Sequence, residues 1–555
     1  MTRLLDSSPT AILRGWTASP LERKTSRLLD GSDEVPEHGE QASARVVSKD
    51  DELLARLGYK RELNRGLGLF ENWAATFSCM NFVSGMPVLF GWVMMTGGPQ
   101  AAFTSWTIVS TVSCLLALAM AEIAAALPTA GGIYFWTFFL AGSEWGPFLS
   151  WMTAWWNWSA WVLAVPGTQQ GATNFLVSAL QINFPDAAFL RDGWFSLLVI
   201  LAGLLIALIP NITSQHLLRV YFRFAIAIFF LLFFLFWLWF PIAVAGRFQP
   251  ASFVFGKFHN GINHGPVPQA SDAYCWVISF LFGAWEFGGY DASAHLAEET
   301  QDAGKTVARG MWLSTLSTTV LSIPTLVLIL FCIQDFDALI AANYANNWAE
   351  FLVQVVGPRG ATAILVFSWI DCTCATAAVI LSAQRVTFAI SRDGILPASS
   401  VFRKVSGANS VPVNAALLVI AIAAAVSCTV LGSSVAFSAI TATTVICQNM
   451  SYLFVLLTRH TLGRSSFEPA PWNLGPLSRL IGYFCLLWIA FLSVILLLPQ
   501  VFPVTLQTLN YSPVCLAIVT LVSVIGWLFP FGRGGRYWFK GPCNTVSPPT
   551  QADRA

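Results

Sequence analysis

Two glycines and an acid interrupt a long apolar run near the middle of the chain. Residues 274–287 are almost wholly apolar, and Gly288, Gly289 and Asp291 follow within the stretch WEFGGYDASAHLAEE. A helix that crosses lipid must satisfy its own backbone hydrogen bonds, so such an interruption is tolerated only where it faces protein or a water-filled cavity. Interrupted helices near mid-membrane hold the substrate in many secondary transporters. We therefore interpret this stretch as part of a carrier's binding site.

A second interruption is predicted in the first apolar segment, at NFVSGMP, residues 81–87. An unwound turn frees N–H groups, and the half-helix beyond it presents its positive dipole end, which suits a carboxylate. Ser84, Gly85 and Met86 are the candidates to bind it. The freed carbonyls around Phe287 to Gly289 suit an ammonium group, so a zwitterionic amino acid is the predicted ligand. The alternative is that these small residues only permit close helix packing.

Glu286 and, within FSWIDCTCATAAV, Asp371 are acids in the interior of apolar segments. A charge at mid-membrane is costly, so each is a functional candidate by default. Glu286 is expected to neutralise the amine of a cationic substrate or to carry a coupling proton. The alternatives are a protonated Glu286 held by a neighbour, and an Asp371 paired with a nearby Ser, Thr or Trp donor.

A further pair of acids, Glu298 and Glu299, ends the sixth apolar segment, and Lys305 and Arg309 follow it. We expect an inner gate of ion pairs that break when the cavity opens inward; a solvated helix end is the alternative. Polar residues of the third and tenth segments are candidates to line the cavity or to bond neighbouring helices together. These residues are Gln169, Gln170, Asn174, Gln448 and Asn449.

The elements that must position these residues are membrane helices. The chain is 55% hydrophobic and only 11% charged, with a mean hydropathy of +0.63, which excludes an ordinary soluble protein. About twelve apolar segments are long enough to cross a bilayer, so an all-α integral membrane protein is predicted. They span 70–95, 101–127, 146–180, 194–210, 217–245, 273–298, 308–333, 361–391, 412–432, 434–458, 479–500 and 511–531.

Five segments separate the two interruptions, which indicates an inverted five-plus-five repeat with helices 1 and 6 broken. Residues 1–65 are expected to form a mostly disordered cytosolic tail and 533–555 a cytosolic C-terminal tail. The first repeat then covers 66–245, the second 246–460, and two extra helices 461–532.

An even number of crossings puts both termini on one side of the membrane, and Lys and Arg counts select the cytosol. The plasma membrane is the expected location, with an organelle membrane as the alternative. In this orientation the outside loops carry only Arg191, Arg247, Lys257 and Arg359. The inside loops carry Arg219, Arg223, Lys305, Arg309, Arg385, Arg392, Arg403, Lys404, Arg459, Arg464 and Arg479.

Several function classes lack sequence support. No phosphate loop, nucleophile elbow or HExxH motif occurs, so we expect no enzyme, and no catalytic residue is assigned. The eleven cysteines show no metal-ligand spacing, so no metal and no cofactor is expected apart from H⁺ or Na⁺ as a coupling ion. The net charge of +1 gives no sign of a nucleic-acid partner, and nothing indicates an oligomeric state.

Over nearly the whole chain after the tail, the sequence resembles the amino-acid–polyamine–organocation superfamily, and in particular its amino acid/choline branch. That branch includes plant bidirectional amino-acid transporters and fungal GABA and choline permeases. The stretches that carry the resemblance are LGYKREL (57–63), AEIAAALPTAGGIYFW (121–136), GYDASAHLAEET (289–300), SRDGILP (391–397), PWNLG (471–475), PVTLQTLNYSPV (503–514) and RYWFKGP (536–542).

The resemblance implies a LeuT-type fold and transport of amino acids or related amines. It matches residues 84–86 and 285–289 with the two substrate-binding interruptions, Trp285 with an aromatic gate over the substrate, and Asp291 with a gating acid. Glu286 and Asp371 depart from the neutral residues expected at their positions. They put the usual substrate range in doubt, because an extra acid favours a cationic amine.

Together these features predict a multi-pass secondary transporter that moves amino acids or GABA-like amines by alternating access. Its partners are a small-molecule substrate and the lipid bilayer. A choline or polyamine transporter is the alternative substrate class. An amino-acid-sensing membrane receptor is the alternative from another class, because its binding site would look similar.

Overall fold

The described part of the chain folds into helices. The computed structural model describes residues 49–60, 62–63, 65–263, 269–405, 411–432, 436–506 and 508–542. These ranges contain no strand, and an isolated bridge joins Leu67 to Thr300. Nine of their helices, counted by length and composition, are able to cross a membrane. Lipid offers no partner for backbone polar groups, so apolar segments of this length become helices. An all-α, multi-pass membrane protein is confirmed to this extent.

Twelve predicted apolar segments all fall on helices, but three of these helices lie outside the nine. The three are α7 (Ile133–Asn183), the pair α11 (Asp272–Ile278) and α12 (Phe280–Glu286), and α21 (Ser512–Leu528). The nine spans are α4 (Leu69–Cys79) with α5 (Phe82–Thr96), α6 (Gly98–Ala126), α8 (Gly193–Ile212), α9 (Gln215–Ala243), α14 (Ala303–Cys332), α16 (Trp348–Arg392), α18 (Val413–Ser427) with η3 (Cys428–Leu431), α19 (Ala436–His460) and α20 (Leu477–Leu496).

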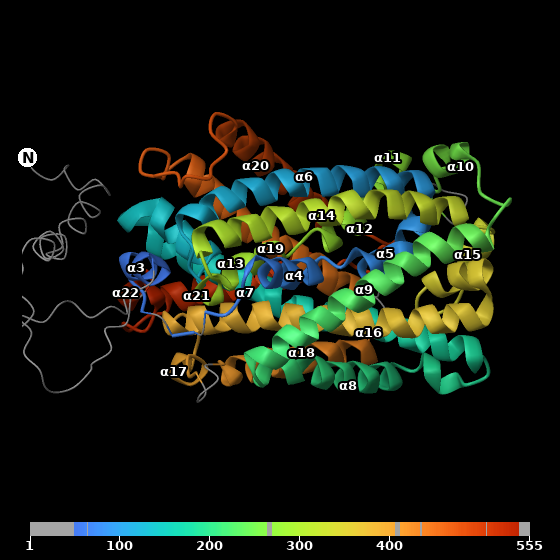
Figure 1. Cartoon of the computed structure of the whole chain (residues 1–555), viewed down its shortest axis with the longest axis horizontal. Helices are drawn as coiled ribbons and strands as arrows, with labels where there is room; N and C mark the ends of the chain where they lie inside the picture. The colour runs from blue at the N-terminus through green and yellow to red at the C-terminus, as the bar shows by residue number, and fades with distance from the viewer. Residues whose placement is uncertain are drawn as a thin grey trace, which may run out of the picture.

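The long helices run along the long axis of the molecule, and short helices lie at its two ends (Figure 1). One end carries α3 (Lys49–Arg56), α17 (Ser399–Phe402) and α22 (Gly535–Trp538), and the other carries α10 (Ala251–Gly256) and α15 (Phe336–Ala341). The 3-10 helix η1 (Ala188–Arg191) precedes α8. In the interior, α7 packs extensively against both α16 and α19.

The first interruption lies earlier than the sequence predicts. The backbone leaves helical geometry at Met80 and Asn81, so α5 begins at Phe82. Ser84, Gly85 and Met86 therefore belong to the first turns of α5, and the Gly85 N–H already donates to the Asn81 carbonyl oxygen over 2.7 Å. The break is held in place by Asn81, whose Nδ2 donates to Asp371 Oδ2 on α16 at 2.7 Å.

The second interruption lies where the glycines predict it. Helix α12 ends at Glu286, and the chain turns through Gly288 and Gly289 before α13 (Ala292–His295) and η2 (Ala297–Glu299). Gly289 has a φ of +87°, which residues with a side chain rarely adopt. A Cβ on Gly288 would lie 2.5 Å from Gln448 Oε1, so a larger residue here would displace the end of that side chain.

The segment before the first membrane helix is not wholly a free tail. Helix α3 and the residues after it place Leu54, Tyr59 and Leu63 in buried positions. The N–H groups of Gly66 and Leu67 donate to the Glu299 carbonyl oxygen at 3.0 and 2.9 Å. Apolar side chains thus anchor residues from 49 onward against the helix bundle, within the stretch expected to be mostly disordered. The earlier part of that stretch, 1–48, lies outside the described residues.

Candidate functional site

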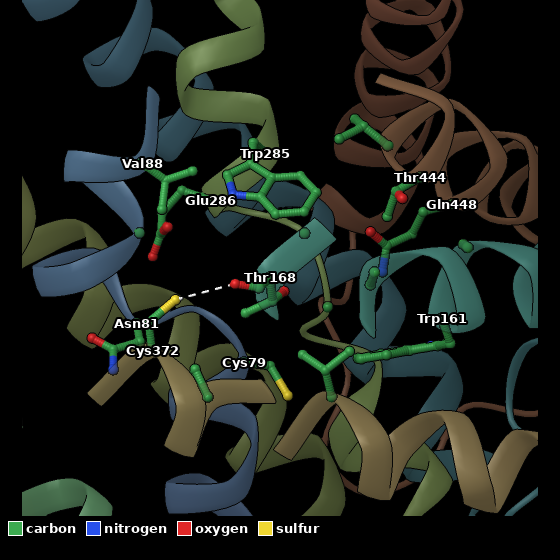
Figure 2. A pocket seen from close by; sticks show the side chains of 18 of the residues that line it. Cys79, Asn81, Val88, Trp161, Thr168, Trp285, Glu286, Cys372, Thr444 and Gln448 are labelled. Atoms are coloured by element: carbon green, nitrogen blue, oxygen red, sulfur yellow. Dashed lines mark hydrogen bonds between the residues drawn. The ribbon is translucent and has the colours of Figure 1, made fainter. Parts of the chain in front are cut away.

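The two interruptions meet at a cavity of about 60 Å³ enclosed by helices of both halves of the chain (Figure 2). Six of the residues predicted from the sequence line it: Ser84, Gly85, Trp285, Glu286, Gly288 and Gly289. Met86 and Phe287 do not line it; their side chains are buried in the surrounding apolar core. The displaced start of α5 turns Met86 away from the cavity, since successive helix residues point in different directions.

Helices α7, α16 and α19 complete the wall. Trp161 and Thr168 come from α7, Cys372 from α16, and Thr444 and Gln448 from α19. Of the polar residues considered from the sequence, Gln448 lines the cavity, whereas Gln169, Gln170, Asn174 and Asn449 do not. Trp161, Thr168 and Cys372 carried no signal in the sequence, because ordinary apolar segments contain such residues throughout.

The Glu286 carboxylate lies directly against the first turn of α5. The side chain is buried, at 4% exposure, and a Cβ on Gly85 would come within 1.8 Å of its Oε2. Figure 2 shows it reaching from α12 toward α5 beside Val88. The first N–H groups of a helix lack partners within it and attract anions. In the described residues, Phe82 and Val83 donate to no backbone acceptor.

The indole of Trp285 lies beside this carboxylate, between Glu286 and Thr444 (Figure 2). Its ring packs on Gly167 of α7, where a Cβ would lie 2.9 Å from the Trp285 ring. The aromatic side chain predicted as a gate therefore forms one wall of the cavity, and a glycine on the neighbouring helix makes room for it.

Asp371 is fully buried behind Asn81, which donates to it, and Ser84, a hydroxyl donor of the kind considered from the sequence, also lies beside it. Among the residues that the structure describes, the buried oxygens near the cavity without a hydrogen-bond partner include Glu286 Oε1, Asp371 Oδ1, Asn81 Oδ1 and Ser84 Oγ. Unpartnered buried acceptors are costly unless a donor satisfies them. The set therefore suits a ligand rich in N–H donors, such as an ammonium group.

Asp291 does not line the cavity but organises two residues that do. Its carboxylate is fully buried and accepts from Trp161 and Gln448, each at 3.1 Å. Asn157 Nδ2 donates to it at 3.1 Å and the Tyr452 hydroxyl at 2.7 Å. One carboxylate thus ties α7, α13 and α19 together beside the second interruption.

His295 extends this network to the loop at 127–132. Its Nε2 lies 3.2 Å from Asp291 Oδ2, and its Nδ1 lies 3.3 Å from the Ala130 carbonyl oxygen. Both partners are acceptors, so the tautomer of the ring decides which of the two contacts is a hydrogen bond. The acid beside the cavity is in this way connected to the PTAGG loop.

The two acids predicted to form a gate make buried ion pairs, but their partners are not Lys305 and Arg309. Glu298 makes a bidentate pair with Arg392, both distances being 3.0 Å, and Glu299 pairs with Arg385. Both arginines come from α16. Lys305 instead contacts Asp302 at 3.6 Å on the exposed surface. The turn at η2 directs the two acids toward α16 rather than toward the next helix in sequence.

The buried ion pairs of Glu298 and Glu299 also lie against the N-terminal segment. Tyr59 and Tyr134 both donate to Asp393 Oδ2, at 3.1 and 2.7 Å, and the Arg392 guanidinium lies 4.0 Å from the centre of the Tyr59 ring. Removing one partner of a buried ion pair costs about 3–5 kcal/mol, because it leaves the other charge buried and unpaired. The two ion pairs lie between the cavity and the end of the molecule that carries α3.

An enclosed cavity at two helix interruptions, backed by buried ion pairs, defines the class: this is a multi-pass membrane transporter. The particular family follows from comparison with known proteins. Residues 70–522 match the family model described as "Amino acid permease". The chain belongs to the amino acid permease family, and with it to the superfamily that its motifs resemble.

Relatives cover nearly the whole chain. It is 30% identical to amino-acid permease BAT1 of Arabidopsis thaliana, over 92% of this chain and 99% of that protein. It is 29% identical to thiamine transporter thi9 of Schizosaccharomyces pombe, over 88% and 86%. A putative polyamine transporter of Candida albicans is 25% identical, over 90% of each. These relatives are transporters rather than enzymes.

Proposed function

We propose that the protein is a secondary transporter that moves amino acids or GABA-like amines across a membrane by alternating access. The observation that carries this proposal is the Glu286 carboxylate lying against α5 with an unpartnered oxygen. The substrate's ammonium group would bind Glu286 and the carbonyls around Gly288. Its carboxylate would bind the N–H groups at the start of α5, beside Ser84 and Gly85.

The size of the cavity supports a small substrate. A volume of about 60 Å³ has room for several waters, because one water needs roughly 10–15 Å³. A single polar group of the substrate, such as its ammonium or its carboxylate, would fit in this space. Glu298 and Glu299, with their arginines, would open to release the substrate inward, and Asp291 would hold Trp161 and Gln448 in place meanwhile.

A choline or polyamine transporter is the second candidate, and the unpartnered oxygens of Glu286 and Asp371 favour it. A zwitterionic substrate has one ammonium group and needs only one acid to neutralise it, whereas two acids lie near the cavity. Thiamine is itself a cation, and the relatives include a thiamine transporter and a putative polyamine transporter. The coupling ion is proposed to be H⁺, which either acid would carry, or Na⁺.

Uptake into proteoliposomes tests this function. With labelled neutral amino acids, GABA, choline and putrescine as substrates, we expect saturable uptake of an amino acid or GABA that a pH or sodium gradient drives above equilibrium. Saturable uptake of choline or putrescine alone would select the second candidate. Binding without any uptake would instead indicate a membrane receptor.

We also propose an inverted five-plus-five repeat of the LeuT type, with the interruptions α4/α5 and α12/α13 in equivalent positions, followed by α20 and α21. The end that carries α3, α17 and α22 would face the cytosol, with both termini, in the plasma membrane. Most Lys and Arg residues of the loops belong to that end, which supports this orientation.

Cysteine labelling checks the orientation, in a background where the exposed Cys428, and Cys543, which lies outside the described residues, are replaced by serine. A cysteine at Gly256, where a side chain meets open space, should react with an impermeant maleimide in intact cells. A cysteine at the exposed Lys305 should react only after permeabilisation. The reverse pattern would overturn the proposed orientation.

A further inference from the structure

A second cavity, of about 250 Å³, lies where α19, α20 and the loop between them meet the end of α6. Three arginines line it: Arg459 at the end of α19, Arg464 in the loop and Arg479 at the start of α20. Phe467 of the same loop belongs to an apolar cluster that includes Leu54, so the cavity lies at the α3 end of the molecule.

The cavity is strongly positive. Its one acid, Glu122, is satisfied by neutral donors, since the Ser478 hydroxyl donates to it at 2.5 Å and the Leu474 N–H at 3.2 Å. Within the described ranges, no ion pair joins any of the three arginines to an acid. Glu122 offsets part of the charge of Arg459, and the excess of three arginines over one acid is left for a ligand.

The Arg459 guanidinium is oriented by a neighbouring ring and, within the described residues, has a free N–H group. The Arg459 guanidinium lies 3.8 Å from the centre of the Phe467 ring, which fixes its plane. Its Nε is buried and donates to nothing among the described residues. A planar guanidinium with free N–H groups matches phosphate oxygens, which it binds through paired, charge-assisted hydrogen bonds.

The face of α20 next to this cavity is apolar and exposed. Its large side chains recur every three or four residues, the spacing of one helix face. They are Leu480, Phe484, Leu487, Phe491 and Val494, with exposures of 69%, 45%, 73%, 45% and 61%. Arg479 and Tyr483 line the cavity directly beside this stripe. A ligand in the cavity thus has a path for acyl chains along α20.

We propose that this cavity binds the phosphate of an anionic phospholipid headgroup, with the acyl chains along α20. Basic pockets between membrane helices on the cytosolic side bind such headgroups. The proposal is independent of the transported substrate and uses only the orientation proposed above. A bound lipid would join the end of α19 to α20, and α19 supplies the Gln448 and Tyr452 donors to Asp291.

Binding of dioctanoyl phosphatidylinositol 4-phosphate to the purified full chain in detergent tests the site, with dioctanoyl phosphatidylcholine as the neutral comparison. Arg464→Gln and Arg479→Gln change exposed side chains, so the fold should persist. Each should weaken binding of the phosphoinositide about fivefold, since each basic residue contributes about 1 kcal/mol. Arg403→Gln, an exposed arginine of the same end on the loop after α17, should leave binding unchanged.

A competition experiment distinguishes a bound lipid from a bound soluble anion. Inorganic phosphate and inositol 1,4-bisphosphate carry the headgroup chemistry without acyl chains, and we expect both to compete only weakly. If they bind as tightly as the lipid, the site holds a free phosphate compound and the lipid proposal is wrong. Equal binding of the phosphoinositide by wild type and both variants, or its absence in wild type, would also overturn it.

Discussion

Uptake of a cationic amine should collapse when Glu286 is replaced by glutamine. The side chain keeps its shape against Gly85 but loses the charge that faces the substrate's ammonium group. Losing one charge of a buried, hydrogen-bonded pair costs about 2–5 kcal/mol, so KM for a cationic amine should rise at least about 30-fold. Neutral amino acids, which also bind through their carboxylate, should lose less. Initial uptake rates into proteoliposomes give both values.

Two other variants sharpen this test. Glu286→Asp keeps the charge but shortens the side chain by one methylene, so its KM should fall between those of the wild type and Glu286→Gln. Glu144→Gln alters an exposed acid and should change nothing. If Glu286→Gln still exchanges substrate but loses uptake driven by a pH gradient, Glu286 carries the proton. Unaltered KM, substrate range and pH response would contradict both roles.

Transport should be abolished by Gly85→Leu while expression and membrane insertion persist. A Cβ at this position would lie 1.8 Å from Glu286 Oε2 and 2.7 Å from its Cδ. Gly85 has ordinary helical geometry inside α5, so the effect is steric and leaves the backbone unstrained. A leucine would displace the carboxylate and fill the space beside the start of α5. Uptake normalised to the amount of protein in the vesicles measures the loss.

The smaller change Gly85→Ala shows which neighbour causes the defect. If the clash with Glu286 is responsible, Gly85→Ala/Glu286→Ala should transport neutral amino acids better than Gly85→Ala alone, a coupling that a double-mutant cycle measures. Gly256→Ala is the matched control, because a Cβ there meets open space. Near wild-type transport by Gly85→Leu would make the first interruption a packing feature only.

The helical fold follows from the sequence because lipid leaves an apolar segment little choice but to form a helix. The second interruption is also predictable, since Gly288 and Gly289 mark it and Gly289 needs its positive φ. The first was misplaced because no glycine lies at the break. Asn81 turns the chain there through its hydrogen bond to Asp371, which lies 290 residues away. No local sequence pattern predicts a contact between residues so far apart.

The partners of Glu298 and Glu299 were likewise not predictable from the sequence. Glu298 and Glu299 are recognisable as buried acids at a segment end, yet their partners lie 94 and 86 residues further on. The nearest cations in sequence, Lys305 and Arg309, suggested a local pairing that the turn at η2 prevents. The charged residues themselves could thus be identified from the sequence. Their partners on another helix could not, because these depend on how α16 packs.

Asp371, Arg385 and Arg392 all belong to α16, separated by fourteen and seven residues. Multiples of seven return to nearly the same helix face, so the three side chains share one side of a rod about 30 Å long. A movement of α16 at the arginines would therefore also move Asp371 beside the cavity. Any substrate that loosens the arginines must in turn bind more tightly, by the same factor, once they are loosened, because such coupling is reciprocal. Binding in the cavity and opening of the ion pairs at the end that carries α3 are then two aspects of one equilibrium.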